Sequence, residues 1–392
     1  MARTPRRIAA PRVARVLIAA SIASGVGACS SLIGADFDVA LAPSGSAGGH
    51  GGSVATGGAG GTSAAGGSGH GGGASTGPDG GAGGSPPDAG ACDGAACVPE
   101  VVVGGLALPW AVTTSGGWVY FTVSGASRGA ATDGYVMRVP GAGGAPQVVA
   151  KDLRIPNQLV VGGGWVYWTS TLASGGVYRA PVDGSASPTL LAADQQNAIG
   201  IALDDTTLYW TAQGSLWSLP VATPAAAPFK LVDGAGSALL ALNGASVLWG
   251  DAAPSSTLKA ARKSDGVVTD LVGGIESPNG IVATDDFAFF TSMGSTNRIG
   301  RIDLKNPAQW AWIAAGQSGP SAIAVDQGYV YWTNFDGGTV LRVLALGAGV
   351  PEVVAVGQDH PDGIALDADY VYWTNFAQNG ALVRLRRSAL AK

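Results

Sequence analysis

The sequence is poor in the residues that most often carry out chemistry. Its 392 residues include three His, three Cys and three Met, and only 12% are charged. A single His, His360, lies in the part of the chain that carries the repeats described below. Serine catalysis needs a partnering His and a nucleophile elbow between a strand and a helix, and we predict no such elbow here. The Cys residues also have no nearby His with which to complete a zinc centre.

The chain also lacks a basic region. It has 22 Lys and Arg against 27 Asp and Glu, which gives a net charge of −5 and a pI of about 5.1. The basic residues after the N-terminal segment are scattered at about one per repeat, whereas a nucleic-acid surface needs them clustered. We therefore expect no nucleic acid among the partners.

The N-terminal segment reads as an export signal. Five Arg residues between Arg3 and Arg15 precede an apolar stretch over 16–27 that is too short to span a bilayer. The stretch ends in Val26-Gly27-Ala28-Cys29, which resembles the bacterial lipobox, in which the Cys is lipidated and becomes the mature N-terminus. We predict a lipoprotein signal over 1–29 with Cys29 as the lipid anchor, and plain secretion is the alternative. Ser30 in place of Asp after the Cys, by resemblance to Gram-negative sorting, implies the outer membrane or cell surface.

A low-complexity segment follows the anchor. The tether is predicted over 30–91, and from Pro43 to Ala91 it is nearly all Gly, Ala and Ser with almost no large apolar side chains, so it cannot offset the entropy of ordering. We expect a disordered tether there. Cys92 and Cys97 lie in a short loop over 92–98, and an exported protein meets oxidants, so we predict that they form a disulfide.

The rest of the chain is repetitive. Two aromatic residues followed by Thr recur six times, at Tyr120-Phe121-Thr122, Tyr167-Trp168-Thr169, Tyr209-Trp210-Thr211, Phe289-Phe290-Thr291, Tyr331-Trp332-Thr333 and Tyr372-Trp373-Thr374. Leu248-Trp249-Gly250 is a degenerate seventh copy, and successive copies are 39 to 47 residues apart. This period is typical of propeller blades and other structural repeats.

One repeat contains four short β-rich runs. In the sixth copy these runs are 322–326, 329–333, 338–343 and 352–355, separated by turn residues. The first run is almost entirely apolar, which predicts a strand buried on both faces, and the third contains an Arg, which predicts one solvated face. The fold class is therefore all-β, a seven-bladed β-propeller of four-stranded antiparallel blades over 99–387, with a tail at 388–392.

The last repeat stops after its third strand. Its missing fourth strand has a candidate in Pro99-Glu100-Val101-Val102-Val103, which closely matches Pro351-Glu352-Val353-Val354-Ala355. We predict that this N-terminal strand closes the ring and so protects the sheet edges.

The repeats resemble known families. Gly200-Ile201-Ala202-Leu203-Asp204 leading to Tyr209-Trp210-Thr211 resembles the YWTD repeats of lipoprotein-receptor propellers, and also the NHL, SMP-30/gluconolactonase and virginiamycin B lyase repeats. This resemblance covers roughly 99–387 and implies the propeller fold rather than an activity. The chain departs from the YWTD pattern in having seven copies, and the fourth letter of the six clear copies is never Asp.

Candidate site residues lie in the turns that enter each first strand. These turns are rich in oxygen ligands suited to Ca²⁺, and they include Gln195, Gln317 and Gln358. Pro156-Asn157 and Ser277-Pro278-Asn279-Gly280 look like the metal-binding turns of SMP-30-like lactonases, which would make Asn157 and Asn279 ligands together with Glu276 or Asp362. His360 is the candidate general base at the channel mouth. Ordinary turn chemistry explains the same residues equally well.

The aromatic residues fall into two groups. Five Trp residues recur at one strand position, which predicts packing between blades, whereas Trp110, Trp118, Trp165, Trp217, Trp310 and Trp312 break the repeat pattern. One of the second group could stack on a sugar or peptide.

Two functional hypotheses follow. The first is a non-catalytic binding or scaffolding propeller, a monomer anchored to the membrane by lipid, with a protein, peptide or glycan ligand and no cofactor. The second is a hydrolase or lyase of the SMP-30 or virginiamycin B lyase type that uses Ca²⁺ at the channel mouth.

Overall fold

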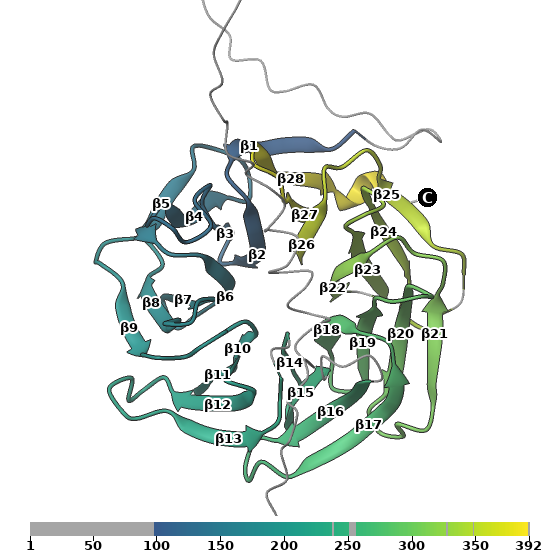
Figure 1. Ribbon diagram of the computed structural model, residues 1–392. Helices are drawn as coiled ribbons and strands as arrows, with labels where there is room; N and C mark the ends of the chain where they lie inside the picture. Colours follow the sequence, from purple (N-terminus) through teal and green to yellow (C-terminus); the bar gives the residue numbers. More distant parts are fainter. Residues whose placement is uncertain (1–97, 237–238, 251–255, 327, 348, 391–392) are drawn as a thin grey trace, which may run out of the picture.

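The chain forms a ring of β-sheets. A computed structural model describes residues 98–390 apart from 237–238, 251–255, 327 and 348. Within these residues 28 strands form seven four-stranded antiparallel sheets around a central axis (Figure 1), which confirms the predicted seven-bladed β-propeller. The predicted signal, the Cys29 anchor, the tether and the Cys92–Cys97 disulfide lie outside the described residues.

Each blade has four strands that follow one another outward from the axis. The innermost strands are β2 (Pro109–Ser115), β6 (Pro156–Gly162), β10 (Ile201–Leu203), β14 (Ala241–Leu242), β18 (Pro278–Ala283), β22 (Pro320–Asp326) and β26 (Pro361–Leu366). The second strands are β3 (Trp118–Val123), β7 (Trp165–Ser170), β11 (Thr207–Ala212), β15 (Ser246–Gly250), β19 (Phe287–Ser292), β23 (Tyr329–Asn334) and β27 (Tyr370–Asn375).

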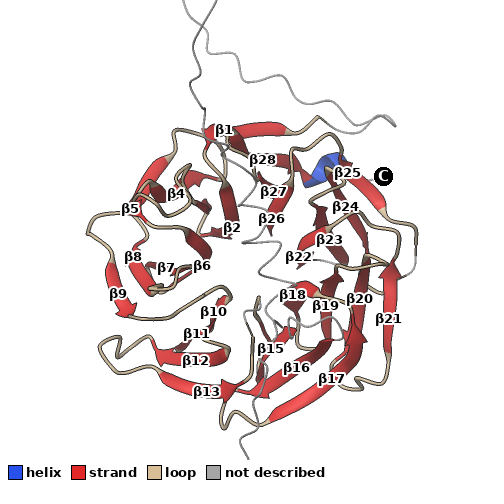
Figure 2. Cartoon of the chain, viewed as in Figure 1, coloured by secondary structure: helices blue, strands red, loops and turns tan. Residues whose placement is uncertain are grey.

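The two outer positions complete the blades. The third strands are β4 (Gly134–Pro140), β8 (Val177–Pro181), β12 (Ser215–Pro220), β16 (Ser256–Arg262), β20 (Arg298–Asp303), β24 (Thr339–Leu344) and β28 (Gly380–Arg386). The outermost strands are β5 (Gln147–Leu153), β9 (Thr189–Ala192), β13 (Phe229–Asp233), β17 (Val268–Ile275), β21 (Trp310–Ala314), β25 (Glu352–Ala355) and β1 (Glu100–Leu106). Figure 2 shows that the ring consists of strands and loops. The short 3₁₀ helix η3 (Arg387–Leu390) lies beside it. Among the residues that the structure describes, no helix has the length and apolar character needed to cross a membrane.

The second strand of each blade, not the first, is the most completely buried. In β23 every residue after Tyr329 is buried, whereas the innermost strand β22 keeps three partly exposed residues at its end. The second strand lies between the faces of the two adjacent blades, while the innermost strand also faces the central channel. The expectation that the first strand is the one buried on both faces is therefore wrong.

The third-strand Arg residues are also more buried than predicted. Arg342 and Arg384 are each only 6% exposed, so the predicted solvated face is wrong in these two blades. Their guanidinium groups lie 4.3 Å above the rings of Tyr329 and Tyr370, the residues that begin the second strands. Cation–π contact and burial of the aliphatic stem offset the loss of solvent.

The same arrangement corrects the interpretation of two Trp residues. Trp118 and Trp165 begin their second strands, as Tyr329 does, and lie 4.0 and 3.9 Å beneath Arg138 and Arg179. They occupy a repeat position and do not break the pattern. The five repeated Trp residues pack between blades as predicted, each at most 1% exposed: Trp168, Trp210, Trp249, Trp332 and Trp373.

The Thr of the repeated motif joins each blade to the next. The Thr374 hydroxyl accepts from the Gly363 N–H of its own blade, at 3.0 Å, and donates to the Trp110 carbonyl of the adjacent blade, at 2.5 Å. Thr291 bridges Gly280 and Ser321 in the same way. Further Thr hydroxyls donate to the carbonyls of Asn157, Ile199 and Asp362. Where both backbone partners are buried, as at Thr291, the hydroxyl satisfies groups that would otherwise be unpaired.

The N-terminal strand closes the ring. Strand β1 pairs antiparallel with β28, with Glu100 opposite Arg384, so the predicted closure is confirmed. The Glu100 carboxylate accepts two hydrogen bonds from the Arg384 guanidinium, at 2.8 and 2.9 Å, as Glu352 accepts from Arg342 in the sixth blade. Arg384 also donates to the Gly141 carbonyl in the first blade. A single side chain thus connects β1, β28 and the neighbouring blade.

Candidate functional site

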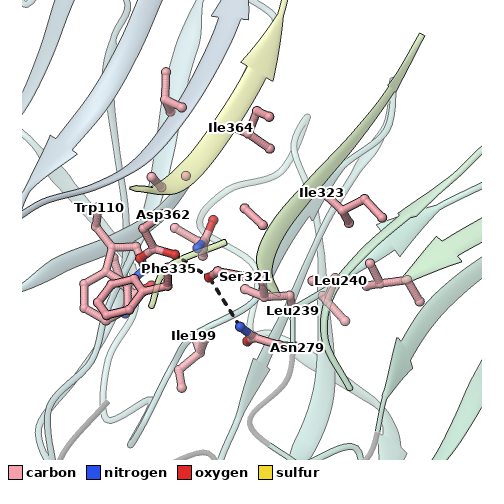
Figure 3. A pocket seen from close by; sticks show the side chains of 18 of the residues that line it. Trp110, Ile199, Leu239, Leu240, Asn279, Ser321, Ile323, Phe335, Asp362 and Ile364 are labelled. Carbon is pink, nitrogen blue, oxygen red and sulfur yellow. Dashed lines mark hydrogen bonds between the residues drawn. The ribbon is translucent and has the colours of Figure 1, made fainter. Parts of the chain in front are cut away.

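A cavity of about 210 Å³ opens at the axis of the ring, and all seven blades contribute to its lining. Its most informative lining residues stand where the chain enters an innermost strand (Figure 3): Trp110, Asn157, Ile199, Leu239, Asn279, Ser321 and Asp362. In five of the seven blades this residue follows the Pro that begins the strand. The bridging Thr hydroxyls bind the backbone carbonyls of several of these residues, so the motif that joins the blades also positions the site.

Glycines allow the innermost strands to approach one another closely beside the cavity. A Cβ atom on Gly363 would lie 2.5 Å from the Trp110 carbonyl oxygen, and one on Gly280 would lie 2.5 Å from that of Ser321. Such contacts are too short for any side chain. The Pro-Asn-Gly and Pro-Asp-Gly sequences therefore serve close packing between blades as well as the turn.

Three polar residues from consecutive blades form one side of the cavity. Ser321 donates to Asp362 Oδ1 at 2.5 Å, and Asn279 Nδ2 donates more weakly to Ser321 Oγ at 3.4 Å (Figure 3). The other carboxylate oxygen of Asp362 accepts no hydrogen bond from the described residues. This side of the cavity therefore offers a carboxylate oxygen to a ligand.

The protein environment perturbs the titration of Asp362. Burial raises the pKa of this carboxyl from its ordinary value of 3.8 to about 6, and the hydrogen bond from Ser321 partly opposes the rise. No cationic side chain forms an ion pair with it among the described residues. Half-buried carboxylates without a cationic partner are common at binding sites. Such a group does not stabilise the fold and is retained because it contacts the ligand.

We expect Asp362→Asn to stabilise the fold in a pH-dependent way. Because the pKa of Asp362 is higher in the folded than in the unfolded chain, wild-type stability is lost as pH rises from about 4 to about 6. At pH 8 the variant should therefore be more stable by about 1 to 3 kcal/mol, and near pH 4 the difference should largely vanish. Denaturant unfolding of both proteins across this range measures it. Asp359→Asn, at an exposed position, is the control, and equal gains at pH 4 and pH 8 would contradict the assignment.

Aromatic rings form the wall next to Asp362. Trp110 meets Phe376 edge to face at 4.9 Å between ring centroids, and Phe376 lies 6.1 Å from Phe335. All three rings line the cavity and are half-buried. Phe335 and Phe376 each stand two residues after the motif Thr of their blade, which places them at the same end of the channel. Figure 3 shows Trp110, Phe335 and Asp362 on one side of the cavity.

The opposite wall is apolar. Ile199, Leu239 and Leu240 come from the third and fourth blades, and Leu239 and Leu240 lie on the far side of Ser321 from Trp110 in Figure 3. Neither of these blades has a Pro-polar pair at the entrance to its innermost strand. The cavity is thus amphipathic, with polar and aromatic residues at the entrances of most blades and aliphatic residues at those of the third and fourth, as is usual for small-molecule sites.

The structure brings together three of the four predicted metal ligands. Asn157, Asn279 and Asp362 line the cavity, whereas Glu276 does not. The Glu276 carboxylate accepts hydrogen bonds from the Ser295 backbone N–H and hydroxyl, at 2.9 and 3.0 Å. Among the described residues no three His, Cys, Asp or Glu side chains cluster in a way that could hold a metal ion.

One oxygen of Asn157 has no partner in the part of the chain that the structure describes. Its amide nitrogen donates to the Thr171 hydroxyl at 2.8 Å, but its Oδ1 is buried and accepts no hydrogen bond from the described residues. Asn157 is 1% exposed and lines the cavity. An unpaired buried acceptor is costly, and a ligand that supplies a donor would relieve it.

His360 lies beside the cavity and is not among the residues that line it. Its Nδ1 is 2.7 Å from Asp359 Oδ1, its ring centroid is 4.8 Å from that of Phe335, and its side chain is about half exposed. The backbone carbonyl of His360 accepts from the Phe376 N–H at 3.0 Å. In this position His360 supports the aromatic wall.

The Gln residues considered as oxygen ligands have another role. Gln195, Gln317 and Gln358 accept hydrogen bonds from the indole N–H groups of Trp210, Trp332 and Trp373, at 2.7 to 2.9 Å. Gln317 and Gln358 also accept from Asn334 and Asn375, which stand where the YWTD pattern has Asp. An Asp at those positions could not donate this hydrogen bond, which gives a physical reason for the departure from the pattern.

Comparisons with known proteins agree with the fold. No family model matches the sequence, and no curated protein matches it. Virginiamycin B lyase from Staphylococcus aureus is similar in structure, with a TM-score of 0.58 at 15% identity over 71% of this chain and 94% of that one. A streptogramin B lyase (TM-score 0.59, 14% identity, 74% and 97% of the two chains) and the WD40 propeller domain of Doa1 (0.59, 11%, 75% and 99%) are also similar. At these identities the likenesses show that the chain has the β-propeller fold and nothing further.

Proposed function

We propose that this protein is a non-catalytic ligand-binding propeller, held by a lipid on Cys29 at the outer membrane or cell surface of a Gram-negative bacterium. The observation that carries the proposal is the amphipathic cavity, to which all seven blades contribute and which combines polar, aromatic and aliphatic lining residues. A small molecule, or the end of a peptide or glycan, would enter the cavity. The protein acts as a monomer in this proposal.

Binding is favoured over catalysis because few side chains of the cavity could act as a general acid or base. Asp362 is the one ionisable side chain among the described lining residues. Its hydrogen-bond partner, Ser321, forms no hydrogen bond with a His among the described residues, and His360 is outside the lining. A single carboxylate orients a ligand well, but it cannot serve as both acid and base in one step.

A ligand screen tests the binding function. Compounds that bind the folded protein should raise its melting temperature by mass action, and Trp110→Leu should abolish these shifts. Trp310→Leu is the matched control, because Trp310 lies on the outermost strand β21, far from the axis, and is also partly exposed. A set of compounds whose shifts are the same in both variants would argue against the cavity as the site.

The anchor rests on Val26-Gly27-Ala28-Cys29. We expect Cys29→Ala to move the protein from the membrane fraction to the soluble exported fraction, because acyl chains contribute about 0.8 kcal/mol for each buried CH₂. Fractionation and the mass of the mature N-terminus measure this, with Ser30→Ala as the control. An unchanged mass and distribution in the Cys29 variant would leave plain secretion as the better interpretation.

The metal-assisted hydrolase or lyase is the second candidate, favoured by the shared placement of Asn157, Asn279 and Asp362. Ca²⁺ takes about six to eight oxygen ligands, and these three side chains supply at most one carboxylate and two amide oxygens. We therefore expect calorimetry with Ca²⁺, Mg²⁺ and Zn²⁺ to show weak binding at most, and chelator to leave the melting temperature unchanged. Micromolar affinity that Asn279→Ala abolishes would favour the enzyme.

A further inference from the structure

The chemical surroundings of Asp362 narrow the class of ligand. Its carboxylate keeps one oxygen available on the cavity side, and the described lining contains no cation to neutralise it. A ligand that fills the cavity without carrying positive charge would bury this carboxylate further from water, at a cost in affinity. A cationic ligand would compensate the charge.

The aromatic wall favours the same class. Trp110, Phe376 and Phe335 form a continuous set of rings along the cavity, at centroid distances of 4.9 and 6.1 Å. Phe376 is tied by its N–H to the His360 carbonyl, two residues before Asp362, so rings and carboxylate are held on one rigid frame. Aromatic rings beside a carboxylate are the combination that recognises ammonium groups, through cation–π attraction together with charge pairing.

Inorganic cations fit these surroundings poorly. The ring carbons and the aliphatic side chains of Ile199, Leu239 and Leu240 cannot replace the water shell of a small metal ion. The same groups bury the methyl or methylene groups of an organic cation favourably. The aliphatic wall across the cavity also leaves space for an apolar part of the ligand.

We propose that the cavity binds an organic cation, an ammonium group seated between the Asp362 carboxylate and the rings of Trp110, Phe335 and Phe376, with its apolar part against Ile199, Leu239 and Leu240. This inference rests on the proposed binding function and specifies its ligand class. The ligand makes no bond to the protein, and no group is transferred.

Three probes of one shape and different charge test the proposal by calorimetry. They are choline, its neutral isostere 3,3-dimethylbutan-1-ol, and the anion 3,3-dimethylbutanoate. We expect choline to bind the full-length protein at least about tenfold more tightly than the alcohol, and the anion to show no binding. Hexyltrimethylammonium should bind more tightly than choline, because its chain reaches the aliphatic wall.

Variants locate the binding. Asp362→Asn should weaken choline binding by about tenfold or more and remove its advantage over the alcohol, whereas Asp359→Asn, on the exposed neighbouring loop, should change neither. Trp110→Leu should weaken both probes, and Phe376→Leu replaces it if that protein does not fold. Choline affinity should also fall as pH decreases through about 6, as the Asp362 carboxylate is protonated. Asp359 and His360 lie on the loop that enters the same strand, and His360→Gln should leave this pH dependence in place.

The outcomes separate two kinds of failure. If the alcohol or the anion binds as tightly as choline, in a way that depends on Trp110, the cavity is a binding site but the organic-cation inference is wrong. Choline binding that is indifferent to Asp362→Asn also overturns the inference. If no probe or screened compound binds in a Trp110-dependent way, the proposed function fails together with it.

Discussion

Removal of Pro99 to Val103 should lower the free energy of unfolding by at least about 3 kcal/mol. The deletion takes away most of β1, including Val102 and Val103, which pack on the core between the last and first blades. It also leaves the Arg384 guanidinium, which is almost fully buried, without its carboxylate partner. An unpaired buried charge is strongly destabilising, and β28 becomes an unprotected sheet edge.

Denaturant unfolding compares this variant with one that lacks five residues of the predicted tether, 57–61. The control deletion shortens the chain equally but removes none of the described strands. Equal unfolding midpoints for the two deletions would show that β1 contributes little to closure. Glu100→Gln, which keeps the strand and removes only the charge, should have an intermediate effect, since Glu100 is itself more than half exposed.

Replacement of Thr374 by Val is expected to have the second largest effect. The two side chains have nearly the same shape, but Val cannot accept from the Gly363 N–H or donate to the Trp110 carbonyl. Each buried backbone group left unpaired costs about 1 to 3 kcal/mol, so we expect a total loss of about 2 to 5 kcal/mol. Thr374 is fully buried, and water is therefore poorly placed to replace the hydroxyl.

Thr374→Ser is the matched control, because it keeps the hydroxyl and removes a methyl group. It should cost about 1 kcal/mol. Denaturant unfolding of the two variants, with unchanged slopes, separates the hydrogen bonds from the packing. A Ser variant as unstable as the Val variant would mean that the methyl group, and not the bridge between blades, explains the Thr. Because Thr374 holds the Trp110 carbonyl, the Val variant should also weaken ligand binding in the cavity.

Much of the fold could be predicted because its determinants are local and repeated. The aromatic-aromatic-Thr motif marks every second strand but one, and its spacing determines the number of blades. The similarity of Pro99-Glu100-Val101 to Pro351-Glu352-Val353 predicted closure, and the structure adds the reason, since both Glu side chains pair with a third-strand Arg. Burial was predicted less well. The strand that lies between two neighbouring blades is determined by contacts between repeats, which the sequence of one repeat does not reveal.

The site was predicted only in part, for a similar reason. Asn157, Asn279 and Asp362 could be identified because a Pro precedes each of them at a strand entrance. Glu276, only three residues from Asn279, is directed to Ser295 by the loop, which sequence spacing does not reveal. Trp110 was one of six Trp residues considered for stacking on a ligand, but the sequence did not single it out. The cavity walls were missed because Trp110, Ile199 and Leu239 belong to three blades and meet only once the ring has closed. The sequence signal that could have revealed the aromatic wall was a Phe two residues after the motif Thr in two successive blades, at Phe335 and Phe376.

Closure by β1 has a mechanical consequence for an anchored protein. The predicted tether would enter the ring at Glu100, the first residue of the strand that completes the last blade. Any pull between membrane and bound ligand would therefore load the Glu100–Arg384 pair before any other contact in the ring, and would peel β1 from β28 one residue at a time. In such a protein β1 both closes the ring and is the first strand to come under force. A force on a large bound ligand would therefore separate the last blade from the first, beside Trp110.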